Sequence, residues 1–369
     1  MKLFSIGCAF VLSVSLLACG SGGGGVETGP DAVQQDQFIK QDLLSGDLTP
    51  TDNPTPSDSG GTDGTTPTDI PGNPETADPG AYDLPGMDTS TPDPKCQTLK
   101  EGTVTGFDVD GTARTFILNL PKGVDNGGPW PVIFNWHGFG DTASNMAHLL
   151  SNQVSNHDYP FILVTPEDTN MQPTKGMDWD ILKISKPNKE ARLFDEVLKC
   201  LDQRYGVDWD GIHSVGFSAG SIMTDLLGVL RGDMMASIAT YSGVYFSNQP
   251  NVDALGSLAS FVSWPQMTTT NTYAQLLVHG GQQDNYNMMV TTLQFDESGK
   301  RDVTWLSGMG HDVIHCTHSG GHTIPSSFND GGGKLVEFFK AHRRGGGAST
   351  WSAGLPADYP KYCTFVAGK

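Results

Sequence analysis

The stretch Gly211–Gly220, which reads Gly-Ile-His-Ser-Val-Gly-Phe-Ser-Ala-Gly, decides the fold. Its first half predicts a buried strand, and the segment Ser221–Leu227 that follows the stretch predicts a helix. Ser218 therefore falls on the sharp turn between the two elements, with glycines at 216 and 220 leaving room for the strained backbone. Because the chain has 46 glycines, the five residues Gly216–Gly220 alone are a weak signal. The strand before it and the helix after it make Ser218 a candidate nucleophile, which needs exposure and a neighbouring base.

Short runs rich in β-branched and aromatic residues alternate with helical segments through the rest of the chain. We expect strands at Thr115–Leu120, Pro131–Trp136, Phe161–Thr165, Ile212–Phe217, Ser237–Ser242, Gln275–His279 and Asp312–Thr317. We expect helices at Ala143–Asn152, Lys189–Arg204, Ala219–Leu230 and Lys334–Arg343. This alternation predicts an α/β fold with a mostly parallel central sheet and helices on both faces. Ligand sites in such sheets lie beyond the carboxyl ends of the strands.

The first 18 residues predict a secretory signal, because a lysine at position 2 precedes an apolar run too short to span a bilayer. The run ends in Leu16-Leu17-Ala18-Cys19, which resembles the lipobox of bacterial lipoproteins. The resemblance implies a lipidated Cys19 that attaches the protein to a membrane of the cell envelope, at the outer membrane or the cell surface. An ordinary secretory signal is the alternative.

Residues 19–94 are rich in Gly, Pro, Thr, Ser and Asp, with 14 acidic residues and one lysine. Such a segment cannot bury enough apolar surface to order itself, so it predicts a solvated tether. Most of the formal charge of −19 lies in it. This balance argues against nucleic acid as a partner.

Residues 95–369 have the length of one large α/β domain, which we expect to be the catalytic unit and monomeric. It contains Cys96, Cys200, Cys316 and Cys363. In an oxidising compartment these predict two disulfides with three possible pairings, and buried free thiols are the alternative. Cys363 suggests that the C-terminal tail folds back on the body.

Two strand-end features could stabilise an oxyanion. The glycine-rich loop after Pro131–Trp136 reads His-Gly-Phe-Gly, and the helix after the nucleophile begins at Ala219. The backbone N–H groups of Phe139 and Ala219 are therefore candidates for an oxyanion hole, each worth roughly 3 kcal/mol in the transition state. A simple strand-to-loop turn is the alternative.

Two further loops offer the partners of a serine nucleophile. Asp284 follows the strand Gln275–His279, and His322 lies among glycines after the strand Asp312–Thr317. A carboxylate can orient an imidazole, which in turn takes the proton of the serine. Asp253 and Asp296 are competitors for Asp284, but neither follows an expected strand.

A metal site is the alternative for the histidines near the last strand, which have a cysteine among them. His311 and His315 lie four residues apart near a strand, which separates them by more than about 12 Å and prevents them from binding one ion. We therefore expect no metal and no cofactor.

The chain order Ser218, Asp284, His322 is that of α/β-hydrolase triads. The motifs HGFG, VGFSAGSIMT, LLVHGGQQD and SGGHTIP resemble the α/β-hydrolase group of extracellular polyhydroxybutyrate depolymerases and feruloyl esterases. The resemblance covers about residues 96–343 and implies a nucleophile, an acid and a base at these three positions. It departs from the group in a loop one residue longer before Asp284, and in the lack of a tryptophan after the histidine motif.

This resemblance implies a serine esterase whose substrate is an ester of plant-cell-wall polysaccharide, feruloyl or acetyl. A polyester depolymerase and a non-catalytic surface binding module are the alternatives. We expect Trp179 and Trp264 to line the substrate site, with ordinary packing as the other interpretation of each. The segment Tyr245–Tyr273 is a candidate lid or wall.

Overall fold

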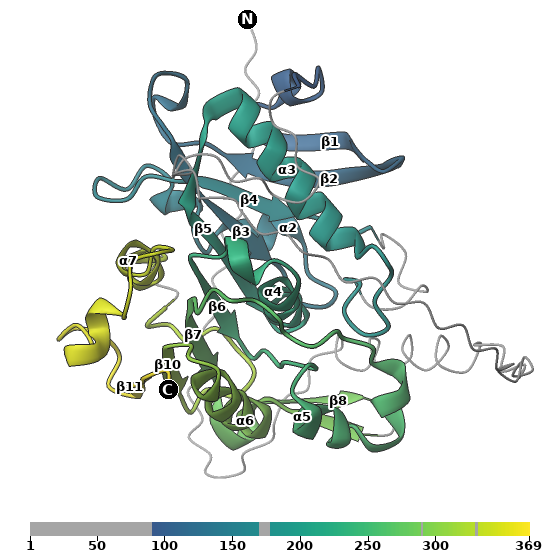
Figure 1. The fold of residues 1–369 in the computed structure, drawn as a ribbon, viewed down its shortest axis with the longest axis vertical. Coiled ribbons are helices and arrows are strands. Elements are labelled where there is room, and N and C mark those ends of the chain that lie inside the picture. The colour runs from purple at the N-terminus through teal and green to yellow at the C-terminus, as the bar shows by residue number, and fades with distance from the viewer. Residues whose placement is uncertain (1–90, 170–177, 289–290, 329–330) are drawn as a thin grey trace, which may run out of the picture.

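A nine-stranded sheet forms the centre of the molecule (Figure 1). The computed structural model describes residues 91–169, 178–288, 291–328 and 331–369. In spatial order, the strands of the sheet are β1 (Gly102–Val109), β2 (Thr112–Asn119), β4 (Ile162–Pro166), β3 (Trp130–Trp136), β5 (Val207–Phe217), β6 (Ser237–Tyr241), β7 (Ala274–His279), β10 (Val313–Thr317) and β11 (Cys363–Val366). A separate hairpin pairs β8 (Asn285–Met288) with β9 (Thr291–Gln294).

The six central strands from β4 to β10 run parallel to one another. The outer strands β1, β2 and β11 pair antiparallel with their neighbours. The carboxyl ends of β5, β7 and β10 therefore meet at one edge of the sheet, and each is followed by a residue of the expected site. The predicted fold class, α/β with a mostly parallel sheet, is confirmed.

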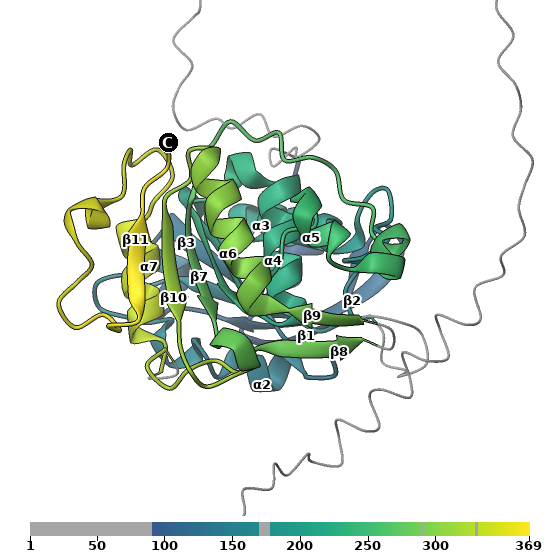
Figure 2. The ribbon, with the colours of Figure 1, turned by 90° about the horizontal axis from the view of Figure 1, so that it is seen from below.

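Helices cover both faces of the sheet (Figure 2). One face is covered by α3 (Lys189–Tyr205), α4 (Ala219–Leu230) and α6 (Phe295–Gly308), whose buried side chains belong to one apolar core. The other is covered by α2 (Ala143–Ala147) and α7 (Gly333–Ala341), which contribute to a second core. A short helix, α5 (Gln249–Asp253), lies beside α6. The two cores bury the sheet on both sides, which explains why the central strands read as continuous apolar runs.

The expected elements are found with shifts of up to three residues at their ends, with two exceptions: the helix expected at Ala143–Asn152 ends at Ala147, and the strand expected at Ile212–Phe217 begins at Val207. Sequence reasoning did not predict α6, whose buried face includes Ser298, Gly299 and Asp302 in addition to apolar side chains. It also missed β1 and β11, which are edge strands with exposed residues. In each case the apolar periodicity is weak because much of the buried or paired surface is polar.

Two disulfides join the four cysteines of the body: Cys96 with Cys200, and Cys316 with Cys363. The prediction of two disulfides is confirmed, and the structure selects one of the three pairings. The second bridge ties β11 to β10, so the C-terminal tail folds back on the body as expected.

The predicted signal and most of the predicted tether, including Cys19, lie outside the described residues and stay predictions. In the part of the chain that the structure describes, none of the helices combines the length and the apolar character that crossing a bilayer requires.

Candidate active site

Ser218 sits on the turn between β5 and α4 with a backbone conformation of φ 53° and ψ −117°, which non-glycine residues rarely adopt. Its N–H donates to the Tyr241 carbonyl on β6 at 2.9 Å, which ties the turn to the sheet. The glycines beside it are required by close backbone approach. A Cβ at Gly216 would lie 2.1 Å from the Gly220 carbonyl oxygen, and one at Gly220 would lie 2.1 Å from that of Trp136.

Three residues far apart in the sequence meet at the carboxyl edge of the sheet. His322 Nε2 lies 2.9 Å from Ser218 Oγ, and His322 Nδ1 lies 2.7 Å from Asp284 Oδ1. Since a carboxylate can only accept, Nδ1 carries the proton and Nε2 presents its lone pair to the serine hydroxyl. The structure therefore brings together all three expected triad residues, in the geometry that activates a serine nucleophile.

Asp284 is fully buried, and each of its carboxylate oxygens is satisfied. Its Oδ2 accepts from Ser242 Oγ at 2.8 Å and from the Gly280 N–H at 2.7 Å, while Oδ1 accepts from His322. These donors fix the carboxylate and compensate its burial. Sequence reasoning missed Ser242, although its place directly after a strand of this sheet edge was a signal.

The imidazole of His322 lies between two phenyl rings. The Phe295 ring stacks on it at 4.9 Å between ring centres with an interplanar angle of 14°, and the Phe217 ring lies on it at 4.9 Å. Only 23% of the His322 side chain is exposed. The rings hold the imidazole in one plane and limit its access to water.

The two competing aspartates lie elsewhere. Asp296 pairs with His279 Nδ1 at 3.2 Å and with Lys300, and Asp253 accepts from the Gln249 amide. Both therefore face partners other than His322.

The loop His137–Gly140 lies against the nucleophile. A Cβ at Gly138 would be 3.5 Å from Ser218 Cβ, so the loop backbone borders the space above the hydroxyl. Among the described residues, neither the Phe139 N–H nor the Ala219 N–H has a hydrogen-bond acceptor. Ala219 opens α4, where the first N–H groups have no partner within the helix. Both amides are thus available to an oxyanion.

We expected Trp179 to line the substrate site, but its side chain is buried inside the protein. It is 2% exposed, its indole packs against Trp136 and His137, and its N–H donates to the His137 carbonyl at 2.9 Å. It therefore supports the loop His137–Gly140 from inside the protein. Trp264 is half-buried, packs edge-on against Phe246 and donates to the Ile181 carbonyl at 2.6 Å, so its role in binding stays a prediction.

A metal site near β10 could not use Cys316 as a thiolate ligand, because Cys316 is in a disulfide. His315 Nε2 instead lies 2.7 Å from His279 Nε2, and burial lowers the pKa of both, that of His279 to about 4. A different group, His137, Glu167 and Asp168, places one nitrogen and two carboxylate oxygens close enough to share one ion or one proton. Sequence reasoning missed this group because its members come from the ends of two strands.

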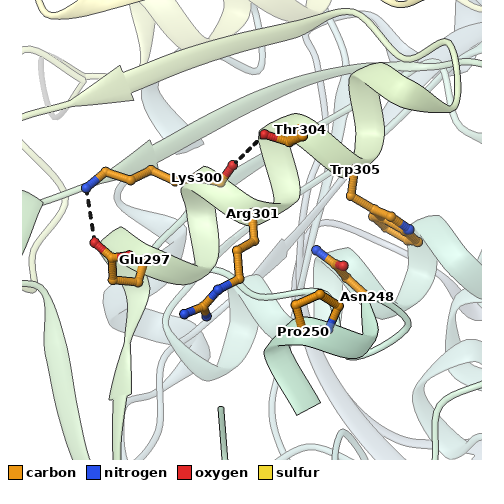
Figure 3. Close-up of a pocket in the computed structure, with 7 residues that line it drawn as sticks. All are labelled: Asn248, Pro250, Glu297, Lys300, Arg301, Thr304 and Trp305. Carbon is orange, nitrogen blue, oxygen red and sulfur yellow. Dashed lines mark hydrogen bonds and ion pairs between the residues drawn. The ribbon is translucent and has the colours of Figure 1, made fainter. Parts of the chain in front are cut away.

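A hollow of about 450 Å³ lies between α5 and α6; Figure 3 shows the residues that line it. It is lined by Asn248, Pro250, Glu297, Lys300, Arg301, Thr304 and Trp305. Each of its charged side chains has a partner within the protein: Lys300 pairs with Glu297 and Asp296, and Arg301 donates to Asn251. It contains no residue of the triad, so we treat it as separate from the site.

Comparison with solved structures agrees with this fold. The crystal structure of native pOPH superposes with a TM-score of 0.56 at 18% identity, covering 74% of this chain and 95% of pOPH. That of native sOPH gives a TM-score of 0.57 at 18% identity, with the same coverage of both chains. The chain has the α/β-hydrolase fold.

A relative in sequence is feruloyl esterase D of Neurospora crassa, 25% identical over 172 residues. The match covers 44% of this chain and 58% of the relative's length. No family model matches the chain. The similarity to esterases that the motifs indicated is thereby confirmed.

Proposed function

We propose that the protein is a serine carboxylic ester hydrolase that works through an acyl-enzyme, with Ser218 as nucleophile, His322 as base and Asp284 as its orienting acid. The hydrogen-bonded line from Ser218 Oγ through the imidazole to the buried carboxylate carries this proposal. The esterase named among its relatives in sequence supports the reaction class.

The mechanism follows from the placement of the protons. Ser218 Oγ attacks the ester carbonyl while its proton moves to His322 Nε2, and Asp284 stabilises the imidazolium that forms. The Phe139 and Ala219 amides bind the oxyanion of the tetrahedral intermediate. The imidazolium returns the proton to the departing alcohol, and water then cleaves the acyl-enzyme by the same steps in reverse order. These steps use the chain's own groups throughout.

The substrate we propose is a feruloyl or acetyl ester of plant-cell-wall polysaccharide. The motif resemblance and the feruloyl esterase relative support this choice. Hydroxyalkanoate polyester is the competing substrate, because the group that the motifs resemble contains both kinds of enzyme.

A hydrolysis screen tests reaction and substrate together. The full chain is incubated with p-nitrophenyl acetate, feruloylated xylan fragments and hydroxybutyrate oligomers, alongside Ser218→Ala. We expect turnover of the first two substrates and none by the variant. No turnover of any ester, or turnover unchanged in Ser218→Ala, would reject the enzyme and leave a binding module. Hydrolysis of the oligomers alone would identify a polyester depolymerase.

We further propose that Cys19 carries acyl chains that hold the protein at the cell envelope, because Leu16-Leu17-Ala18-Cys19 resembles a lipobox. Several acyl chains anchor stably, whereas a single one does not. Metabolic labelling with palmitate tests this point. We expect the label in the wild type and release of an unlabelled protein by Cys19→Ala, and label that survives this substitution contradicts the anchor.

A further inference from the structure

Three polar groups of the loop His137–Gly140, on both sides of Phe139, are each bound to a fixed partner. The His137 carbonyl accepts from the Trp179 indole at 2.9 Å. The Gly138 carbonyl accepts from His137 Nδ1 at 2.9 Å, and the Gly140 N–H donates to Asp178 Oδ2 at 2.5 Å. The peptide units on either side of Phe139 therefore have only one orientation that satisfies these contacts.

The two ring nitrogens of His137 both face oxygens that can only accept. Nδ1 faces the Gly138 carbonyl, and Nε2 lies 3.3 Å from Glu167 Oε1 and 3.8 Å from Asp168 Oδ2. The side chain is 0% exposed, so bulk solvent does not reach either nitrogen. A neutral imidazole has one N–H, which leaves a lone pair pointing at an acceptor. Protonation at both nitrogens removes this conflict.

The surrounding charges favour this protonated form. Burial by itself lowers the pKa of His137, but the interactions with Glu167, with the Gly138 carbonyl and with Asp178 outweigh it, so the pKa is raised above its usual value. Burial by itself raises the pKa of Glu167, yet its pairing with His137 and the hydrogen bond from the Ala143 N–H contribute to a net lowering. The remaining carboxylates that face the ring are Asp168 and Asp178, and burial raises the pKa of Asp178 to about 6.

We propose that His137 is a buried imidazolium clamped by Glu167, and that His137 and Asp178 are positioning residues that aim the Phe139 amide at the oxyanion. His137 fixes the peptide before Phe139 through the Gly138 carbonyl, and Asp178 fixes the peptide after it through the Gly140 N–H. The proposal rests on the proposed esterase function.

Positioning of this kind acts on the transition state. The oxyanion exists only after attack, so a misaimed amide lowers kcat and leaves KM nearly unchanged. Loss of a whole oxyanion donor costs roughly 10²–10³-fold in kcat, so misaiming one is expected to cost about 10–100-fold. Because the clamp needs the second proton of His137, kcat should also fall as the pH rises through the raised pKa of His137, which gives the pH profile an alkaline limb.

The test compares His137→Gln, Asp178→Ala and Asp178→Asn with two matched controls. His157→Gln is the same change at a fully exposed histidine. Asp141→Asn removes a carboxylate at the end of the loop, and in the described part of the chain this carboxylate bonds only to Asn145. The kcat and KM for p-nitrophenyl acetate are measured from pH 5.5 to 9.5, with melting temperatures.

We expect His137→Gln to lower kcat about 10–100-fold with KM within about threefold, and to remove the alkaline limb that both controls keep. Asp178→Ala is expected to show the same split. Asp178→Asn should recover most of the rate, because its amide oxygen can still accept from the Gly140 N–H.

Separate outcomes reject the inference and the function. The inference alone is overturned if Ser218→Ala is inactive while His137→Gln keeps the wild-type kcat and the alkaline limb. Full activity of Ser218→Ala overturns the function beneath it. If His137→Gln does not fold, ¹⁵N spectra of histidine-labelled wild type decide, since the inference requires one imidazolium with both nitrogens protonated at pH 7.

The same oxygen and nitrogen atoms could hold a divalent cation instead of the proton. After dialysis against EDTA, the wild type and Glu167→Gln are titrated with Zn²⁺ and with Mn²⁺. We expect no change in melting temperature. A metal-dependent rise in the wild type that Glu167→Gln abolishes would overturn the imidazolium assignment.

Discussion

Replacing Asp284 by asparagine is the sharpest test of the triad, because the structure determines which way the new amide must point. The carboxylate accepts from three donors: the Gly280 N–H, Ser242 Oγ and His322 Nδ1. Asparagine has one acceptor oxygen and one NH₂ donor. The Gly280 N–H is a backbone donor that cannot turn away, so the asparagine oxygen takes that side and the NH₂ faces His322.

The consequence is that His322 adopts the other neutral tautomer. Nδ1 must then accept, so the proton moves to Nε2, which can no longer take the proton of Ser218. A triad with the wrong tautomer loses roughly 10⁴-fold in kcat. At about 1.4 kcal/mol for each factor of ten, this corresponds to about 5.5 kcal/mol of transition-state stabilisation. Substrate binding does not involve this carboxylate, so KM should change little.

The assay is the pH dependence of kcat and KM for p-nitrophenyl acetate, with thermal unfolding to show that the variant is folded. Asp253→Asn, at an exposed competitor, is the matched control and should behave as wild type. If Asp284→Asn keeps its activity within tenfold while Ser218→Ala is inactive, the assignment of the acid is refuted. A large loss in Asp296→Asn would then move the acid to that residue.

Three further predictions concern the scaffold. Gly220→Ala should lower the free energy of unfolding by more than about 3 kcal/mol in chemical denaturation, because its Cβ would lie 2.1 Å from the Trp136 carbonyl oxygen; Gly308→Ala, where no atom lies within 4 Å, is the control and should be nearly neutral. Cys363→Ser should cost about 2–4 kcal/mol and expose the C-terminal segment to proteolysis, and equal protease resistance with and without the Cys316 bridge would contradict this. Burial lowers the pKa of His213 to about 3, so the unfolded chain binds a proton there that the folded protein does not; stability should therefore fall from about pH 6.5 toward pH 3, by up to about 1.4 kcal/mol per pH unit relative to His213→Gln, as read from denaturation curves.

Local sequence was enough wherever one short segment carried the whole signal. The strand, turn and helix around Ser218 could be predicted because the apolar run and the two glycines are contiguous. Asp284 and His322 could be proposed because each follows a strand of a parallel sheet, whose carboxyl ends share one edge. The α/β class followed from the alternation of the same runs.

Tertiary structure decided whatever depends on atoms brought together from several segments. The helix α6 was invisible because Ser298, Gly299 and Asp302 occupy its buried face, where packing overrides apolar periodicity. Trp179 looked like a binding-site aromatic, but only the fold shows that its indole points inward to the loop.

The chain by itself thus determined the α/β class, the candidate nucleophile and its candidate partners, since each of these is encoded in one contiguous stretch. The pairing of the cysteines, the hydroxyl of Ser242 on the acid and the clamp of His137 by Glu167 were decided only when the sheet formed. Hydrogen bonds and disulfides depend on distances of a few ångströms between side chains, and the packing of the folded chain sets those distances.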